Sequence, residues 1–269
     1  MLGKELFFDT KLSSDGTISC ATCHQLENGG DDNMKVSIGI NGQHGTINAP
    51  TVLNAAFNYY QFWNGRAKTL KDQAMGPVEN PAEMGHDFKS LVKEMEKTAY
   101  KKKFYSIYSN GITKENIADA IAEYEKTLIT PNSPFDLYLK GDLSALTQDE
   151  KDGFELFKTK GCIACHHGVN VGGNLYNKFG IFVSSESNDL GRYNVTHKER
   201  DKYYFKVPSL RNVEKTAPYF HDGRTQDLNE AVRTMAMYQL GRKITDEEVR
   251  KIVAFLKSLN GELLQETKQ

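Results

Sequence analysis

The sequence lacks the features that mark nucleic-acid-binding and membrane-spanning proteins. Its 34 Lys and Arg residues are balanced by 35 Asp and Glu residues, so there is no basic excess with which to bind nucleic acid. No run of about 18 apolar residues occurs, so no segment is predicted to cross a bilayer as a helix. Low-complexity stretches are absent too, and 39% hydrophobic with 26% charged residues is typical of a globular protein. A length of 269 residues favours two domains over one small disulfide-stapled module.

Cysteine is scarce, and its four residues all fall in two copies of one pattern, Cys-x-x-Cys-His at 20–24 and 162–166. This pattern is the attachment motif for c-type heme. On a helical turn, positions i, i+3 and i+4 share one face, so two thiols can bond the vinyl groups of a heme while the histidine ring reaches its iron. The sequence therefore predicts two covalently attached c-type hemes. The predicted attachment residues are Cys20, Cys23, Cys162 and Cys165, and the predicted proximal ligands are His24 and His166.

Two other uses of paired cysteines fit less well. A thioredoxin-like redox pair would lie near a βαβ pattern, and no such strand alternation surrounds either copy. A zinc site made from two Cys-x-x-Cys pairs usually has them about 15–20 residues apart. Here 142 positions separate Cys20 from Cys162. Zinc would also leave the histidine after each pair unexplained.

The two motifs divide the chain nearly in half, so each half is expected to hold one heme. A helical pattern from Ile117 to Leu128 ends at Pro131–Pro134, where two prolines interrupt regular structure. The predicted domains are therefore an N-terminal domain over 1–133 and a C-terminal domain over 134–269.

The remaining patterns indicate helices joined by long loops. Capping boxes at Thr147–Glu150 and Thr245–Glu248 predict two further helices, of which the first runs towards Cys162. The segments 25–52 and 167–208 are rich in Gly, Asn and Ser and are expected to be loops that bind something. The expected fold is mainly α, with two cytochrome c-like domains in which the hemes form much of each core.

The expected location follows from the predicted chemistry. The residues after Met1 do not have the charged and then apolar regions of a secretory signal. Covalent heme attachment in bacteria takes place outside the cytoplasm. We therefore expect a periplasmic protein whose leader is absent from this chain.

Further blocks of sequence match a known family. Together with the heme motifs, these blocks resemble the bacterial diheme cytochrome c peroxidases over nearly the whole chain and in the family's order. The resemblance implies a two-domain, mostly helical enzyme that reduces hydrogen peroxide to water with electrons from a small donor protein such as a monoheme cytochrome c. The matching blocks are Leu2–Asp9, Asn48–Thr51, Phe62–Ala67, Asn80–Met84 and Ala217–Gly223.

The resemblance assigns different roles to the two hemes. In that family the N-terminal heme is the low-potential centre where peroxide reacts, and the C-terminal heme is the high-potential site where electrons enter. His24 would then be the proximal ligand of the first and His166 of the second. Met235 matches the family's methionine ligand on the far side of the second heme, and a thioether ligand raises the reduction potential relative to bis-histidine ligation. By residue type alone Met237 would serve equally well, but the matching block that ends at Tyr238–Gly241 assigns the role to Met235. Without the resemblance, a core methionine is the plainer interpretation of Met235.

Two residues match the family's catalytic machinery. Glu83 matches the glutamate that moves a proton between the peroxide oxygens, so that water leaves instead of hydroxide. Trp63, the only tryptophan, matches the residue between the two hemes, where an aromatic ring shortens the tunnelling path. Without the resemblance, Glu83 would be interpreted as a solvated loop charge and Trp63 as an interface-packing aromatic.

The resemblance implies a calcium ion as well. Asn48 matches a side-chain ligand, and Thr216 and Pro218 match residues that donate backbone carbonyls. Hard oxygen ligands of this kind suit Ca²⁺. Because these residues come from both halves of the chain, the ion would join the two domains. On residue types alone, Asn48 and Pro218 are ordinary turn residues.

One position departs from the family. Many relatives block the peroxidatic heme with a distal histidine eight residues before the asparagine of the Asn-Ala-Pro-Thr block, and here that position is Ile40. His44, in the same loop, is either a replacement ligand or a solvated loop histidine. If His44 binds, reduction of the C-terminal heme is expected to release it and open the iron. If nothing binds, the enzyme is expected to be active in its oxidised form.

Two other functions stay open at this point. A diheme oxidase that matures a protein-bound tryptophan cofactor shares the scaffold, but it characteristically has a tyrosine ligand where this chain has Met235. A diheme electron-transfer protein would have both irons permanently six-coordinate and no peroxidase activity. The family resemblance also suggests a homodimer.

Overall fold

The computed structural model describes residues 1–184 and 187–264, and it is mainly helical. The helices of the first half are α1 (Leu2–Phe8), α2 (Cys20–Cys23), α3 (Leu70–Glu79), α4 (Phe88–Met95), α5 (Tyr100–Tyr105) and α6 (Lys114–Glu125). Those of the second half are α7 (Pro134–Leu139), α8 (Gln148–Lys160), α9 (Tyr193–Thr196), α10 (Leu228–Leu240) and α11 (Asp246–Lys257). Two short strands, β1 (Tyr176–Lys178) and β2 (Tyr204–Lys206), pair antiparallel with Tyr176 opposite Lys206.

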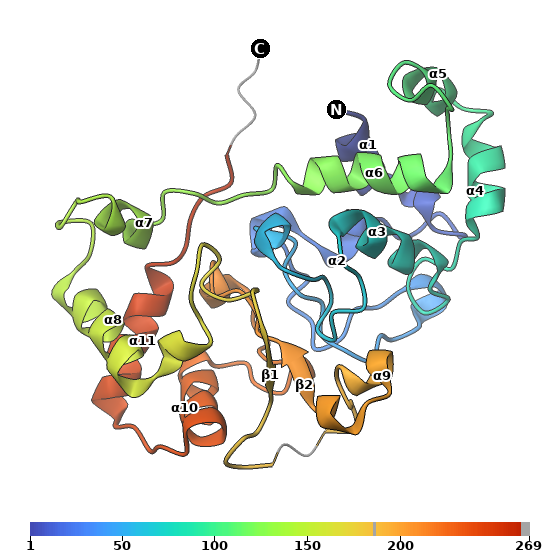
Figure 1. Ribbon diagram of the computed structural model, residues 1–269. Coiled ribbons are helices and arrows are strands. Elements are labelled where there is room, and N and C mark those ends of the chain that lie inside the picture. Colours follow the sequence, from blue (N-terminus) through green and yellow to red (C-terminus); the bar gives the residue numbers. More distant parts are fainter. Residues whose placement is uncertain (185–186, 265–269) are drawn as a thin grey trace.

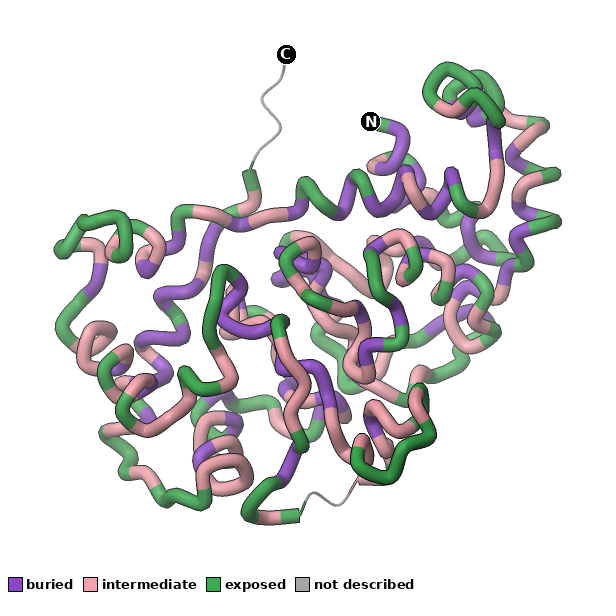
Figure 2. The backbone as a smooth tube through the Cα atoms, in the orientation of Figure 1, coloured by how far each residue is buried: buried purple, intermediate pink, exposed green. Residues whose placement is uncertain are grey.

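The buried side chains form two large clusters, one in each half. The first joins α1, α3, α4 and α6, and the second joins α8, α10 and α11. In Figure 1, α1–α6 lie on one side, α7, α8, α10 and α11 lie on the other, and β1 and β2 lie between them. Figure 2 shows buried backbone running through both groups. The expectation of a mainly helical protein is confirmed.

In each half one early helix packs closely on the last helix, and the two contacts are alike: α1 packs on α6, and α8 packs on α11. A Cβ atom on Gly3 of α1 would lie 1.8 Å from the carbonyl oxygen of Ala120 in α6, so only glycine permits this approach. A Cβ atom on Gly153 of α8 would likewise lie 1.9 Å from the carbonyl oxygen of Lys251 in α11. An aromatic pair follows one turn later in each case. The ring centroids of Phe7 and Tyr124 are 5.3 Å apart, and those of Phe157 and Phe255 are 5.1 Å apart.

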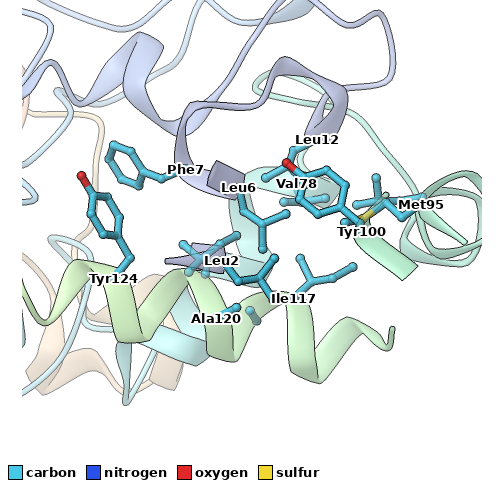
Figure 3. Close-up of a cluster of buried hydrophobic side chains, with 14 of the residues drawn as sticks. Leu2, Leu6, Phe7, Leu12, Val78, Met95, Tyr100, Ile117, Ala120 and Tyr124 are labelled. Carbon is cyan, nitrogen blue, oxygen red and sulfur yellow. The ribbon is translucent and has the colours of Figure 1, made fainter. Parts of the chain in front are cut away.

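Figure 3 shows this contact in the first half. Leu2, Leu6 and Phe7 of α1 point towards Ile117, Ala120 and Tyr124 of α6. Leu6, Phe7 and Ile117 are fully buried. A helix of seven residues is unstable alone in water, so α1 owes its stability to this packing.

The sequence-based expectations for the helices agree with the structure, and one loop differs. Thr147 and Thr245 form capping boxes with Glu150 and Glu248 at the starts of α8 and α11. The segment 25–52 contains only short 3-10 turns. The segment 167–208, expected to be a loop, contains α9 and the β1–β2 ribbon. Strands of three residues are too short to show a period-two pattern, so the sequence gives no sign of them.

A buried hydrogen-bond node joins the two halves at Thr130. The Thr130 hydroxyl accepts hydrogen bonds from the side-chain amides of Asn54 and Asn212, each at 2.8 Å. The Thr130 backbone N–H donates to the Asn54 side-chain oxygen at 2.9 Å, and the Gly261 N–H donates to that of Asn212 at 3.0 Å. All three side chains are buried, so this polar group is shielded from water and internally satisfied.

The chain crosses back to the first half near its C-terminal end. Gly261 lies against the Thr130 carbonyl, and Leu263 packs against the hydrophobic cluster of the first half. In Figure 1 this segment passes the linker between α6 and α7. The division into 1–133 and 134–269 stays a prediction. The two clusters support it, whereas Leu263 belongs with the first cluster, and 265–269 lie outside the described residues.

Replacing Thr130 with Val tests the node, because valine keeps the shape and removes the hydroxyl. Two buried amides would lose their acceptor, so we expect the free energy of unfolding to fall by about 1–3 kcal/mol. Urea unfolding followed by circular dichroism measures this change. The matched control is Thr127→Val at an exposed hydroxyl, which is expected to change stability by less than about 0.5 kcal/mol. An equal effect of the two substitutions would contradict the importance of the node.

Candidate functional site

The N-terminal motif begins with the single-turn helix α2. Ser19 and Thr22 form a capping box that fixes this turn, and Cys20 and Cys23 are its first and last residues. Burial raises the pKa of Cys20 well above its ordinary value and that of Cys23 to about 11. Both thiols are therefore protonated at neutral pH and differ from the reactive low-pKa thiolate of a redox pair.

His24 is oriented by the loop that follows it. Its Nδ1 atom lies 3.2 Å from the carbonyl oxygen of Gly30, so Nδ1 carries the proton and donates it, which leaves Nε2 free to bind a metal. Burial lowers the pKa of His24, which favours the neutral ring. Metal ligation requires this neutral form.

Glu83 lies on a tight turn close to this motif. The Asn80 side-chain amide donates to Glu83 Oε1 at 2.6 Å, and the Glu83 backbone N–H donates to the Asn80 carbonyl at 3.0 Å. Burial raises the pKa of Glu83, while the Asn80 hydrogen bond and the charge of Arg66 oppose this rise. The negative charge of Glu83 in turn contributes to the raised pKa of Cys23. A half-buried carboxyl group therefore lies near the N-terminal motif.

Ile40 is docked directly onto the Glu83 turn. Its backbone N–H donates to the Glu83 carbonyl at 2.8 Å, and its side chain is 6% exposed and packs against Gly85. The loop is closed by a bridge between Ile38 and His44, and the His44 side chain is exposed. The structure thus brings Ile40, but not the His44 ring, into the interior beside Glu83.

The C-terminal motif borders a mainly apolar cavity. The helix α8 ends at Gly161, whose φ of +104° is in the left-handed region, and a 3-10 turn over Cys162–Ala164 follows. Cys162, Cys165 and His166 line this cavity, which has a volume of about 230 Å³ and opens to the surface. Concave, mainly apolar sites with a few polar groups are typical of cofactor binding. Burial raises the pKa of Cys162 to about 11.

Met235 lines the same cavity as His166. It lies on α10, and Phe157, Ile252 and Leu256 complete the apolar wall. Met237 instead lines a shallow surface depression with Arg233 and Tyr238. The structure therefore distinguishes the two methionines that residue type could not, and it favours Met235 as the residue that faces His166.

Trp63 lies at the junction of the halves. Residues of the second half form hydrogen bonds with the backbone of residues 63–65. The Trp63 carbonyl accepts from the Lys206 N–H at 2.8 Å, and the Trp63 indole N–H donates to the Asn48 carbonyl at 2.9 Å. The Arg192 guanidinium donates to the carbonyls of Asn64 and Gly65 at 3.0 and 2.6 Å. It also packs over the rings of Tyr60 and Tyr176. Nothing in the sequence singled out Arg192, because its partners are about 128 residues away in the chain.

The three residues assigned to calcium border the same cavity. The Asn48 side-chain amide donates to the Met34 carbonyl at 2.9 Å, which leaves its Oδ1 free to bind a cation. Within the described chain, no hydrogen bond to the carbonyls of Thr216 and Pro218 is present. Residues from both halves thus line one cavity, and their amide and carbonyl oxygens are the kind of ligand that Ca²⁺ prefers.

The other histidines have structural surroundings. His221 is 2% exposed, stacks on Phe205 with ring centroids 4.1 Å apart, and lies 6.3 Å from Trp63 between ring centroids. His86 is buried and lies 3.4 Å from a Glu94 oxygen. His167 and His197 are exposed.

The residues present fit two c-type hemes. His166 is partly buried beside the apolar cavity, and this burial lowers its pKa to about 4, so its ring is neutral. Its Nδ1 atom has no hydrogen-bond partner in the described part of the chain. All four cysteines are free thiols. Among residues 1–184 and 187–264, no three His, Cys, Asp or Glu side chains gather as a metal cluster, so the two cysteine pairs do not meet as a zinc site requires.

A helical protein with two such motifs, each ending in a partly buried neutral histidine, is a diheme c-type cytochrome. Residues 1–144 match the family model for di-haem cytochrome c peroxidase, and residues 150–260 match the model for cytochrome c. The chain belongs to the di-haem cytochrome c peroxidase family.

Several named proteins are similar to this chain. The cytochrome c551 peroxidase of Nitrosomonas europaea is 51% identical over 97% of this chain and 79% of its own length. The cytochrome c peroxidase Ccp of Escherichia coli is also 51% identical over 97% of this chain, which spans only 57% of that relative. A solved MauG-like protein associated with microbial copper homeostasis is 26% identical, with a TM-score of 0.86 over 97% of this chain and 89% of its own.

The helices are too short or too polar to cross a membrane. This holds for every helix in the described residues, the longest of which, α8 and α10, have 13 residues each.

Replacing Arg192 with Ala tests its hold on the Trp63 segment. Charge-assisted hydrogen bonds contribute about 1.5–3 kcal/mol each, so we expect amide hydrogen exchange at Gly65 and Lys206 to become at least about tenfold faster. Exchange followed by mass spectrometry measures this. Arg200→Ala is the control, because that side chain is 79% exposed and is expected to leave the same amides unchanged. Equal amide exchange rates in the two variants would show that Arg192 does not stabilise the Trp63 segment.

Proposed function

We propose that this protein is a peroxidase that reduces hydrogen peroxide to water, with electrons that enter at the C-terminal heme and pass to the N-terminal one. One observation carries the proposal: the residues near the two motif histidines differ. Met235 and His166 line one cavity, whereas the N-terminal motif has Glu83 and the aliphatic Ile40 nearby. One closed and one open iron is the arrangement that an electron-fed peroxidase requires.

The assignment of the cofactor residues follows from these surroundings. Cys20, Cys23, Cys162 and Cys165 would attach the two hemes, and His24 and His166 would be the proximal ligands. When bound, the N-terminal heme supplies an iron with a free position for peroxide, and the C-terminal heme supplies a second electron. Ligation by Met235 would raise the potential of the C-terminal heme, as an electron entry site requires.

Glu83 performs the proton chemistry in this proposal. Its carboxylate takes the proton from the nearer peroxide oxygen and returns it to the departing one, so that water leaves instead of hydroxide. The raised pKa brings Glu83 nearer to neutral pH, where a group can both accept and return a proton. The Asn80 amide holds the carboxyl group in place at 2.6 Å.

We propose that Asn48, Thr216 and Pro218 bind a calcium ion between the halves. This ion would lie near Trp63, the residue proposed to lie between the two hemes. A small donor protein such as a monoheme cytochrome c would supply the electrons, and the family suggests a homodimer. The periplasm is the proposed location, because covalent heme attachment occurs outside the bacterial cytoplasm.

The proposal is tested by Glu83→Gln. Glutamine keeps the shape of the side chain but cannot move the proton, so we expect turnover with peroxide to fall by about 10²–10⁴-fold while both heme absorption spectra are unchanged. Stopped-flow or steady-state peroxide consumption measures this.

Glu79→Gln is the matched control, because Glu79 is four residues away, exposed and paired with Lys114. Its turnover is expected to match that of the unchanged protein. Full activity in Glu83→Gln would remove Glu83 from the mechanism. No peroxide consumption by the unchanged protein, oxidised or half-reduced, would favour the electron-transfer alternative.

We also propose that no protein side chain blocks the N-terminal iron in the oxidised protein. The exposed His44 ring would reach the iron only if the Ile38–His44 bridge and the Ile40–Glu83 hydrogen bond opened. Ile40 has no atom that can ligate iron. The protein is therefore proposed to react with peroxide without prior reduction.

Replacing His44 with Ala tests this proposal. We expect the electron paramagnetic resonance spectrum of the oxidised protein to stay unchanged, with a high-spin signal from the N-terminal iron. His197→Ala, at another exposed histidine, is the control. A low-spin spectrum that becomes high-spin only in His44→Ala would show instead that His44 is a ligand.

A further inference from the structure

Lys206 is a largely buried lysine whose ammonium group has no ion-pair or side-chain hydrogen-bond partner among the described residues. Its side chain lies at the end of β2, and the residue is only 6% exposed. In the part of the chain that the structure describes, no carboxylate forms an ion pair with its ammonium group and no side chain hydrogen-bonds to it. Most other lysines of the fold either pair with acids or reach solvent, so this isolation sets Lys206 apart.

The surroundings of Lys206 belong to the C-terminal cavity. Its backbone N–H donates to the Trp63 carbonyl, which fixes its strand at the junction of the two halves. Lys206 lines the same cavity as Cys162, His166 and Met235. The buried ammonium group is therefore next to the space that the attachment motif reserves for its cofactor.

Burial has an electrostatic cost that an anion would offset. Burial lowers the pKa of Lys206 to about 8, and no neighbouring acid opposes this. An unpaired buried ammonium is destabilising, whereas one that meets a carboxylate recovers much of that cost. A buried lysine beside an apolar cavity therefore indicates an anionic group on whatever fills the cavity.

We propose that Lys206 binds a carboxylate of the porphyrin held by Cys162 and Cys165, and so helps to set the potential of that heme. Heme carries two propionate carboxylates, and they lie on the edge opposite the vinyl groups that bond cysteine. The Lys206 ammonium neutralises one of them. A cation near the iron favours the reduced, less positive form, so Lys206 raises the reduction potential at the entry site. This inference rests on the proposed function, because it requires a heme at this motif.

Spectroelectrochemical titration of the intact diheme protein tests the role of Lys206. Methionine is unbranched like lysine, only one atom shorter, and carries no charge. In Lys206→Met we expect the ratio of reduced to oxidised C-terminal heme, at a fixed potential, to fall about tenfold, which equals 59 mV for one electron. In Lys206→Arg, which keeps the charge, the ratio is expected to stay within about twofold. The potential of the N-terminal heme is the internal reference and is expected to stay unchanged.

Lys178→Met is the matched control, because Lys178 lies on the partner strand β1 with an exposed side chain. Its potentials are expected to equal those of the unchanged protein. If Lys206→Met loses the heme, Lys206→Gln takes its place. Loss of heme from both neutral variants but not from Lys206→Arg would also support the proposal, because only the charge distinguishes them.

Three outcomes would overturn the inference. In the first, a neutral variant of Lys206 retains both hemes and the potential of its C-terminal heme does not shift. In the second, Lys178→Met shifts that potential equally, and in the third, Lys206→Arg loses heme as the neutral variants do. Pyridine hemochrome analysis of the unchanged protein counts its covalent hemes, and so distinguishes failure of this inference from failure of the proposed function. A protein without two covalent hemes would defeat the function itself.

Discussion

A buried hydrogen-bond node at the Thr130 hydroxyl joins the two halves of this protein, and the segment around Trp63 and the segment after His166 both bond to it. Asn54, which bonds to Thr130, lies between Asn48 and Trp63 in the chain. The Asn54 carbonyl also accepts from the side chain of Asn170, four residues after His166. The node thus ties the segment that carries Trp63 to the one that carries the C-terminal proximal histidine. Because a buried polar group has no water to replace a lost partner, the halves are held in one relative position.

The C-terminal half has an incomplete core without its cofactor. Leu210, Val232 and Ile244 pack against the hydrophobic cluster, line the cavity and are only partly buried. A prosthetic group in the cavity would remove their remaining apolar surface from water. Free energy from cofactor binding then contributes directly to folding, as in other proteins whose sites form only in the folded state. Assembly and stability are therefore one process in this half.

The sequence predicted what depends on local patterns. The heme motifs, the capping boxes at Thr147 and Thr245 and the mainly helical fold each follow from residues a few positions apart. Residue type could not separate Met235 from Met237, because both are methionines on one helix, and only the direction in which each side chain points distinguishes them. Lys206 and Arg192 were missed for another reason. Their partners at positions 63–65 are more than 120 residues away, so no local pattern marks them. The roles of the site residues stay predictions that the geometry supports.

The return of Leu263 to the first half affects the order in which the protein can be completed. The N-terminal cluster begins at Leu2 but takes one of its contacts from a residue made 261 positions later. A ribosome, or a translocation channel, releases the chain from its N-terminal end. The first half therefore cannot make this contact until residue 263 has been synthesised and released.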